Sequence, residues 1–237
     1  MARKLNIGGT SRLPGWEVFE IGSSDADEQV RNFGDLSMFA DNTFESLYAS
    51  HLLEHFDYQG DLQRVLDEWF RVLEPGGKLF LSVPDLDVLA RMFLDKAAFS
   101  AEERFFIMRM MYGGHIDAAD FHLVGLNEEF LTGFLDRSGF VQIRRVTDLG
   151  VFNDTSRMRF RDELISLNMV AEKPPKIETP VVLNLPEQSL PHSSSTQSVH
   201  VAKILVVIVV DGEHKTVSGT NGTVEMQQVR NLIFRRA

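Results

Sequence analysis

The first 172 residues alternate between short apolar runs and stretches in which apolar residues recur every three or four positions. A short apolar run between turn residues is typical of a buried strand, whereas the longer spacing is typical of an amphipathic helix. The last two predicted strands are joined by an irregular polar stretch that can form a hairpin. The predicted strands are residues 5–7, 16–21, 46–50, 78–84, 140–146 and 165–171.

Helical spacing is clearest in Asp61–Leu73, where Asp61 is the predicted N-cap and Pro75-Gly76-Gly77 the predicted stop. Residues 86–112 carry the same spacing with a break near Ser100, which with Glu103 forms a capping-box pattern. A further helix is expected from Glu128 to Ser138. Because strands alternate with helices, we predict an α/β fold: a mostly parallel sheet with helices on both faces and an antiparallel C-terminal hairpin.

The pattern changes after Lys173, because five of the eight prolines fall between residues 174 and 191, followed by a run of Ser and Thr. This composition is typical of a linker. Beyond it, residues 204–210 (ILVVIVV) are strongly β-prone, and Asn221-Gly222 is a turn signal. We predict a domain over residues 1–172, a linker over 173–200 and a β-prone tail over 201–237. An exposed edge of this kind aggregates, so residues 204–210 are expected to pair with another strand.

Composition excludes several classes of function. The chain has no cysteine, which excludes disulfides, zinc-thiolate sites and thiol catalysis. Its formal net charge of −10 disfavours a nucleic-acid partner, because phosphate binding needs clustered Lys and Arg. The N-terminal stretch MARKLNIGG lacks the apolar region of a signal peptide, and no apolar run approaches the length that spans a bilayer. We therefore expect a cytoplasmic protein that does not enter a membrane.

The first candidate site is the glycine pair Gly8-Gly9, which directly follows the first predicted strand. Glycines in such a turn let the backbone approach a ligand, although a lone pair of this kind is more often a structural turn. Glu20 at the end of the second strand suits a ribose diol. It follows Gly9 by only 11 residues, too few for the helix of a dinucleotide-binding unit, so an NAD-type site is disfavoured.

A second candidate is HLLEH, residues 51–55, which matches the H-x-x-E-H pattern of inverted zinc peptidases. That pattern must lie on a long helix, whereas the residues before it are a predicted strand and Gly60 soon interrupts any helix. A loop between strand and helix, at the carboxyl edge of the sheet, is the favoured interpretation, and no metal ligands are assigned.

Four stretches together resemble the class I, Rossmann-like S-adenosylmethionine-dependent methyltransferases over residues 4 to about 172. They are KLNIGGT, VFEI, GDLSMFADNTFESLYASHLLEH and RVLEPGGKLFLSVPD, of which the last is the most specific. The resemblance implies that Gly8 and Gly9 line the methionine end of the cofactor and that Glu20 holds its ribose. It also implies that Asp35 and Leu36 flank the adenine and that Ser50 and His51 close the pocket.

The stretch MYGGHIDAADFH, residues 111–122, supplies candidate catalytic groups. A general base assists methyl transfer when the acceptor is a hydroxyl or a protonated amine. His122, His115 and Asp120 are the candidates, with His122 favoured because its apolar neighbours indicate partial burial. A metal site and a solvent-exposed loop, held by its own hydrogen bonds, are the alternative interpretations.

The predicted function is methyl transfer from S-adenosylmethionine to a small-molecule or glycan-type acceptor. A methyltransferase-like protein that only mediates protein association, as a homo-oligomer through its C-terminal tail, is the main alternative. A zinc hydrolase built on His51 and His55 is the weaker one.

Overall fold

The computed structural model describes residues 2–19, 33–116 and 120–176, together with the backbone of three further strands in residues 178–182, 203–210 and 213–220. The chain separates into two compact units, Met1–Pro174 and Pro175–Ala237. In the described part of the chain, no helix is both long enough and apolar enough to cross a bilayer.

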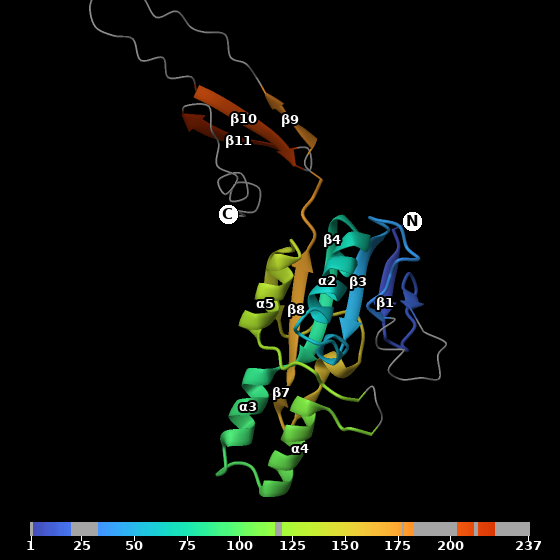
Figure 1. Cartoon of the computed structure of the whole chain (residues 1–237), viewed down its shortest axis with the longest axis vertical. Coiled ribbons are helices and arrows are strands. Elements are labelled where there is room, and N and C mark those ends of the chain that lie inside the picture. Colours follow the sequence, from blue (N-terminus) through green and yellow to red (C-terminus); the bar gives the residue numbers. More distant parts are fainter. Residues whose placement is uncertain are drawn as a thin grey trace, which may run out of the picture. The chain divides into compact units, whose positions relative to one another are not determined.

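A six-stranded sheet in the order β2-β1-β3-β4-β8-β5 forms the centre of the first unit (Figure 1). Strands β1 to β4 are mutually parallel, whereas β8 runs antiparallel to both β4 and β5. The predicted fold class, with its C-terminal antiparallel hairpin, is confirmed. The strands are β1 (Lys4–Ile7), β2 (Glu17–Phe19), β3 (Phe44–Ser50), β4 (Leu73–Pro84), β5 (Val141–Val146) and β8 (Ser166–Glu172).

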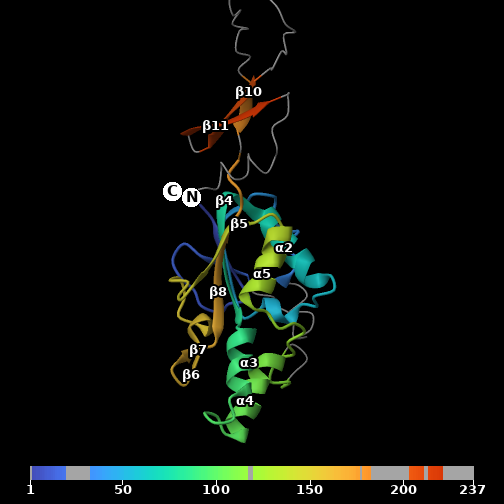
Figure 2. The same ribbon diagram turned by 90° about the vertical axis from the view of Figure 1, so that its left-hand side faces the viewer.

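Two helices, α2 (Asp61–Val72) and α5 (Glu128–Arg137), cover one face of the sheet (Figure 2). The predicted apolar stripe of α2 is buried, with Trp69 fully inside the main core. On the opposite face, the loop residues Leu149 and Phe152 pack with Tyr48 and Val170. Among the described residues this second face is therefore covered by a loop where helices were expected.

Two details at the ends of α2 differ from the prediction. The N-cap is Gly60, and Asp61 lies in the first turn, where a negative charge suits the positive end of the helix dipole. The helix ends at Val72, and Pro75-Gly76-Gly77 lies inside β4, at a register shift against β3. Leu73 is extended, with ψ 140°, so the helix has already ended before the proline is reached.

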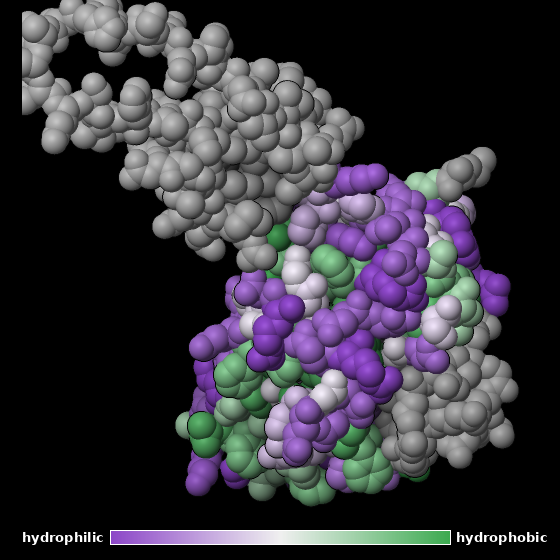
Figure 3. All heavy atoms as spheres, turned by 45° about the horizontal axis from the view of Figure 1, so that its top comes forward, coloured by the Kyte–Doolittle hydropathy of each residue, from purple (hydrophilic) through white to green (hydrophobic). Residues whose placement is uncertain are grey.

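Helices α3 (Leu86–Leu94) and α4 (Ala101–Tyr112) pack together beyond the end of β4 (Figure 1). The predicted break at Ser100 is confirmed, because Ser100 and Glu103 form a reciprocal capping box. Several large apolar side chains of this pair are exposed, among them Leu94, Phe105 and Phe106. In the space-filling view, hydrophilic residues predominate on the upper part of the face shown and hydrophobic ones become more frequent toward its lower edge (Figure 3).

Small elements complete both units. The first contains the 3-10 turns η1 (Leu53–His55) and η2 (Thr155–Arg157) and the strand pair β6 (Arg159–Phe160) and β7 (Glu163–Leu164). The second is a three-stranded antiparallel sheet, β11-β10-β9, made of β9 (Glu178–Val182), β10 (Lys203–Val210) and β11 (Glu213–Thr220).

The predicted pairing of residues 204–210 is confirmed by the two neighbours of β10. Strand β9 lies in the stretch that was expected to be a linker. Asn221-Gly222 lies outside the described residues.

Candidate functional site

The candidate site lies at the edge where the parallel strands β1, β3 and β4 end. Their register aligns Ile7 with Ala49 and Ser50 with Ser82. The next residue after β3, His51, donates its backbone N–H to the carbonyl of Ser82 at 2.8 Å. The residues that follow each strand therefore meet at one edge, where open α/β sheets bind their ligands.

The glycine turn after β1 is held in a conformation that side chains would disturb. Gly8 has φ +75°, in the left-handed region. A Cβ at Gly9 would lie 2.4 Å from the Nδ2 of Asn6, whose buried side chain donates to the carbonyl of Ser11 at 3.3 Å. The turn consequently presents backbone alone at the end of β1, as a site for a ligand carboxylate requires.

The same turn adjoins the segment that follows β3. A Cβ at Gly8 would lie 3.2 Å from the Cδ2 of Leu52, the neighbour of His51. The two segments that were assigned to the cofactor from sequence are therefore in contact, although 42 positions separate Gly9 from His51 (51 − 9 = 42).

The other predicted cofactor residues have different surroundings. Glu20 lies outside the described residues. Asp35 is exposed, and the bond that its carboxylate accepts from the backbone N–H of Ser37, at 2.9 Å, lowers the pKa of this acid. Ser50 shares a hydrogen bond of 2.9 Å with the hydroxyl of Thr155. The predicted role of the Leu36 side chain is wrong, because this side chain is fully buried in the main core and is not available to flank an adenine.

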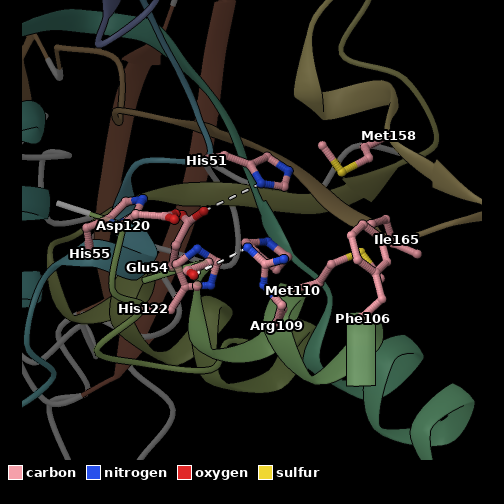
Figure 4. A pocket seen from close by; sticks show the side chains of 13 residues that line it. His51, Glu54, His55, Phe106, Arg109, Met110, Asp120, His122, Met158 and Ile165 are labelled. Carbon is pink, nitrogen blue, oxygen red and sulfur yellow. Dashed lines mark hydrogen bonds and ion pairs between the residues drawn. The ribbon is translucent and has the colours of Figure 1, made fainter. Parts of the chain in front are cut away.

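A cavity of about 390 Å³ opens next to His51 (Figure 4). Its polar wall consists of His51, Glu54, His55, Arg109, Asp120 and His122. Its apolar wall is formed by Phe106, Met110, Met158 and Ile165. This mixture of an apolar wall and a few convergent polar groups is typical of a site for a small organic ligand.

His51 connects this cavity to the strand edge. Its Nε2 lies 2.9 Å from the hydroxyl of Ser166, which itself donates to the carbonyl of Thr155 at 2.8 Å. Ser166 must therefore accept from His51, so the proton of His51 is on Nε2 and its lone pair is on Nδ1. Burial lowers the pKa of His51 to about 4, with the neighbouring histidines adding to the effect. The ring is accordingly neutral near pH 7.

Glu54 is a functional candidate that the sequence analysis did not assign. Only 1% of it is exposed, neither carboxylate oxygen has a hydrogen-bond partner, and burial raises its pKa to about 8. Its Oε1 lies 3.5 Å from the Nδ1 of His51. A buried ionisable group with a strongly shifted pKa in a cavity is typical of functional sites. The signal in the sequence was the Glu of the H-x-x-E-H pattern.

Backbone pairing brings His122 to the same place. The backbone carbonyl of Glu54 accepts from the N–H of Leu123 at 2.8 Å, and the rings of His55 and His122 lie 5.0 Å apart in an edge arrangement. The Nδ1 of His122 is buried without a hydrogen-bond partner. Burial, with the adjacent His55, lowers the pKa of His122 to about 4.

The other two predicted catalytic residues are neighbours, because His115 donates its backbone N–H to the carbonyl of Asp120 at 3.1 Å, but their side chains have different surroundings. Asp120 lines the cavity, whereas His115 is not one of its lining residues. The exposed ring of His115 stacks on Phe121 at 4.0 Å, and its Nε2 lies 2.8 Å from the carbonyl of Tyr112. These contacts are those of a loop that is held by local interactions.

The HLLEH stretch forms a 3-10 turn directly after β3, as the loop interpretation predicted. His51 has a left-handed backbone, with φ +52°, and lies outside the helical turn that contains His55. The two histidines therefore do not lie one turn apart on a long helix, which the zinc-peptidase pattern requires.

Gly113→Ala is expected to destabilise the cavity wall by about 2 kcal/mol, the middle of the range for a strained backbone position. Gly113 has φ +88°, and a Cβ there would lie 2.1 Å from the backbone oxygen of Asp120. Urea denaturation measures the change. The matched control is Gly133→Ala in α5, where a Cβ meets nothing within 4 Å and a gain of up to about 1 kcal/mol is expected. Equal effects at the two positions would contradict the prediction.

Comparison with known families matches residues 20–81 to a methyltransferase domain model. This match confirms the resemblance that the motifs indicated, over the segment that contains Asp35, Ser50, His51 and Glu54. The comparison with curated proteins gave no match.

Solved structures with related folds include a protein from Bordetella parapertussis described as a possible exported protein, at 12% identity and TM-score 0.45. The alignment covers 73% of this chain and 62% of that one, so this chain spans less than two thirds of that protein. A S-adenosylmethionine-dependent methyltransferase from Methanosarcina mazei has 16% identity and TM-score 0.41, with 68% of each chain covered. A methyltransferase of the same description from Archaeoglobus fulgidus has 14% identity and TM-score 0.37, over 66% of this chain and 67% of that one.

Proposed function

We propose that this protein is a S-adenosylmethionine-dependent methyltransferase that acts on a small-molecule or glycan-type acceptor. The observation that carries the proposal is the methyltransferase-domain match over residues 20–81. His51 lies near the middle of this segment, at the strand edge, and lines the cavity. The glycine turn after β1 adjoins the same edge and supplies the complementary cofactor side.

The residues at the strand edge fit the cofactor. The turn at Gly8 and Gly9 has no side chain between its backbone and a ligand, so its N–H groups can bind the methionine carboxylate. Glu20 accepts hydrogen bonds from the ribose, Asp35 lies on the adenine side, and Ser50 and His51 close the site toward the acceptor. When bound, S-adenosylmethionine supplies an electrophilic methyl group on a sulfonium centre.

The acceptor occupies the cavity that His51 borders. Its volume of about 390 Å³ lies within the ~300–1,000 Å³ range of small-molecule sites. The apolar wall excludes water and positions the acceptor, which is the main requirement of methyl transfer.

When the methyl acceptor is a hydroxyl compound, its proton must move to a nearby base. His122 is the proposed base. Its lowered pKa keeps the ring neutral near pH 7, and its Nδ1 has no hydrogen-bond partner in the described structure. Asp120, on the same wall, favours the protonated ring electrostatically. His115 supports the loop through its stack on Phe121.

Isothermal titration calorimetry with S-adenosylhomocysteine tests the cofactor site. Gly9→Val is expected to weaken binding by at least about tenfold, roughly 1.4 kcal/mol, because the new side chain displaces Asn6 from the turn. Gly133→Ala, remote on α5, is expected to bind as tightly as the natural protein. Absence of binding to the natural protein at millimolar ligand would overturn the proposed function.

A further inference from the structure

We infer that Glu54, His55 and His122 form a binding site for one divalent transition-metal ion. One side-chain donor atom from each residue lies within 4.8 Å of the other two. The three residues come from two segments, η1 and the loop before α5, and the bond between Leu123 N–H and the Glu54 carbonyl holds those segments together. The cluster is therefore part of the folded framework and not a chance meeting of surface side chains.

The strongest support comes from polar atoms that lack partners. Both carboxylate oxygens of Glu54 and the Nδ1 of His122 are buried without a hydrogen bond in the described structure. Burying such groups uncompensated is unfavourable, and native proteins usually pair them or place a metal among them. Figure 4 shows the Glu54 carboxylate between the rings of His51 and His122, facing the cavity. A cation at this point would satisfy oxygen and nitrogen lone pairs together.

The histidine rings are oriented as metal-binding histidines are. His55 has its Nδ1 3.0 Å from the carbonyl of Phe121, which accepts only, so the ring proton is on Nδ1 and the lone pair is on Nε2. A ring that donates one N–H to a backbone carbonyl while its other nitrogen binds a metal is a common arrangement. His51 is fixed in the same manner by Ser166, and its Nδ1 lone pair points toward Glu54.

The donor set indicates which cation fits. Two imidazoles and one carboxylate favour Zn²⁺, Fe²⁺, Co²⁺ or Mn²⁺ over Mg²⁺ and Ca²⁺, which prefer oxygen ligands. Three protein ligands leave at least one coordination position, as in catalytic zinc sites. The cluster lines the cavity, so that position is available to a ligand there.

The role of the ion rests on the proposed function. An acceptor hydroxyl on the open coordination position would be fixed in place and made more acidic, because a divalent cation stabilises the oxyanion. In the metal-bound protein His122 would be a ligand through its partnerless Nδ1 and not the base, and the proton of the coordinated hydroxyl would pass to solvent in the cavity. The acceptor class that follows is a hydroxyl compound able to coordinate a metal.

Zinc binding to the full-length protein tests the site without any cofactor. After removal of metals with EDTA and dialysis, titration with Zn²⁺ is expected to show one equivalent with submicromolar affinity. Co²⁺ is expected to give the visible absorption of a nitrogen- and oxygen-ligated ion. Glu54→Gln and His122→Asn are each expected to weaken Zn²⁺ binding by about 100-fold or more, because losing a ligand costs at least as much as losing an outer-shell partner, which costs about 10–100-fold.

The control is Glu129→Gln, which removes an exposed acid on α5 and is expected to leave Zn²⁺ affinity unchanged. Circular dichroism establishes that each variant is folded. A natural protein that binds no Zn²⁺, or whose affinity is the same in folded Glu54→Gln, would overturn the inference. Calorimetry with S-adenosylhomocysteine in EDTA separates the two proposals, because cofactor binding without metal binding removes the metal site alone.

Discussion

Replacing Glu54 with glutamine is expected to raise the free energy of unfolding of the metal-free protein by about 3 kcal/mol at pH 7. The reason is the burial of the carboxyl group, which has no hydrogen-bond partner and a pKa raised from 4.5 to about 8. Glutamine has nearly the same shape and carries no charge, so it removes the ionisation of the unfolded chain that competes with folding. The side chain is then a functional group that is held at a cost to stability.

The effect has a defined pH dependence. The folded state binds the Glu54 proton more tightly than the unfolded state does. The contribution of Glu54 to the free energy of unfolding is therefore most favourable below pH 4.5 and falls as the pH rises toward about 8. His51, His55 and His122 face the carboxyl group. The pKa values of His51 and His122 are lowered from 6.5 to about 4, so their titration makes stability rise between about pH 4 and 6.5. This opposing slope is present in both proteins and cancels in the difference between Glu54→Gln and the natural protein. The increase in the free energy of unfolding that Glu54→Gln causes is therefore expected to grow from below about 1 kcal/mol at pH 5 to about 3 kcal/mol at pH 7.

Urea denaturation in EDTA at several pH values measures this slope. The matched control is Glu129→Gln, an exposed acid on α5, for which a change within about 0.5 kcal/mol and no comparable slope are expected. A Glu54→Gln variant that is less stable than the natural protein at pH 7 would show that the carboxylate is compensated in the folded state.

The parts of the fold that depend on local spacing could be predicted from the sequence. The apolar stripe of α2 identifies its buried face, and the Ser100–Glu103 capping box lies where the helical spacing is interrupted. The resemblance to methyltransferases implied that the glycine turn and His51 border the same site, and Leu52, the neighbour of His51, does lie against Gly8.

Two features depend on tertiary contacts that no spacing reveals. The side chain of Leu36 is buried in the main core, and its position next to Asp35 in the sequence did not distinguish packing from ligand contact. Glu54 and His122 lie 68 positions apart (122 − 54 = 68), and they are neighbours because the Glu54 carbonyl accepts the N–H of Leu123. The partnerless carboxylate becomes visible only once burial and hydrogen bonds are known.

The second large effect is expected at Asp85, which joins the end of β4 to α3. Its fully buried carboxylate accepts hydrogen bonds from the backbone N–H groups of Asp87 and Val88 and forms an ion pair with Arg145 on β5. Asp85→Ala removes an N-cap, which typically contributes about 1 kcal/mol, and the ion pair with Arg145, whose side chain is 39% exposed. Because solvent screens the charge that remains on Arg145, the expected loss is about 2 kcal/mol.

Asp85→Asn separates the two contributions, because asparagine is also a good N-cap but carries no charge. Its expected loss is about half that of Asp85→Ala, roughly 1 kcal/mol. Arg145→Met, combined with each change in a double-mutant cycle, gives the coupling between the charges. Equal losses in the two Asp85 variants would assign the effect to the ion pair alone, whereas a full rescue by asparagine would assign it to the cap.

Asp85→Ala is also expected to loosen the wall of the cavity. Helix α3 packs against α4, which contributes Phe106, Arg109 and Met110 to the cavity wall. Weakening the first turn of α3 is therefore expected to raise amide hydrogen exchange in α4 of Asp85→Ala, while exchange in α5 stays near that of the natural protein. Equal protection of α4 in both proteins would mean that the apolar cluster of Met92, Ile107 and Ile165 holds the cavity wall without help from Asp85.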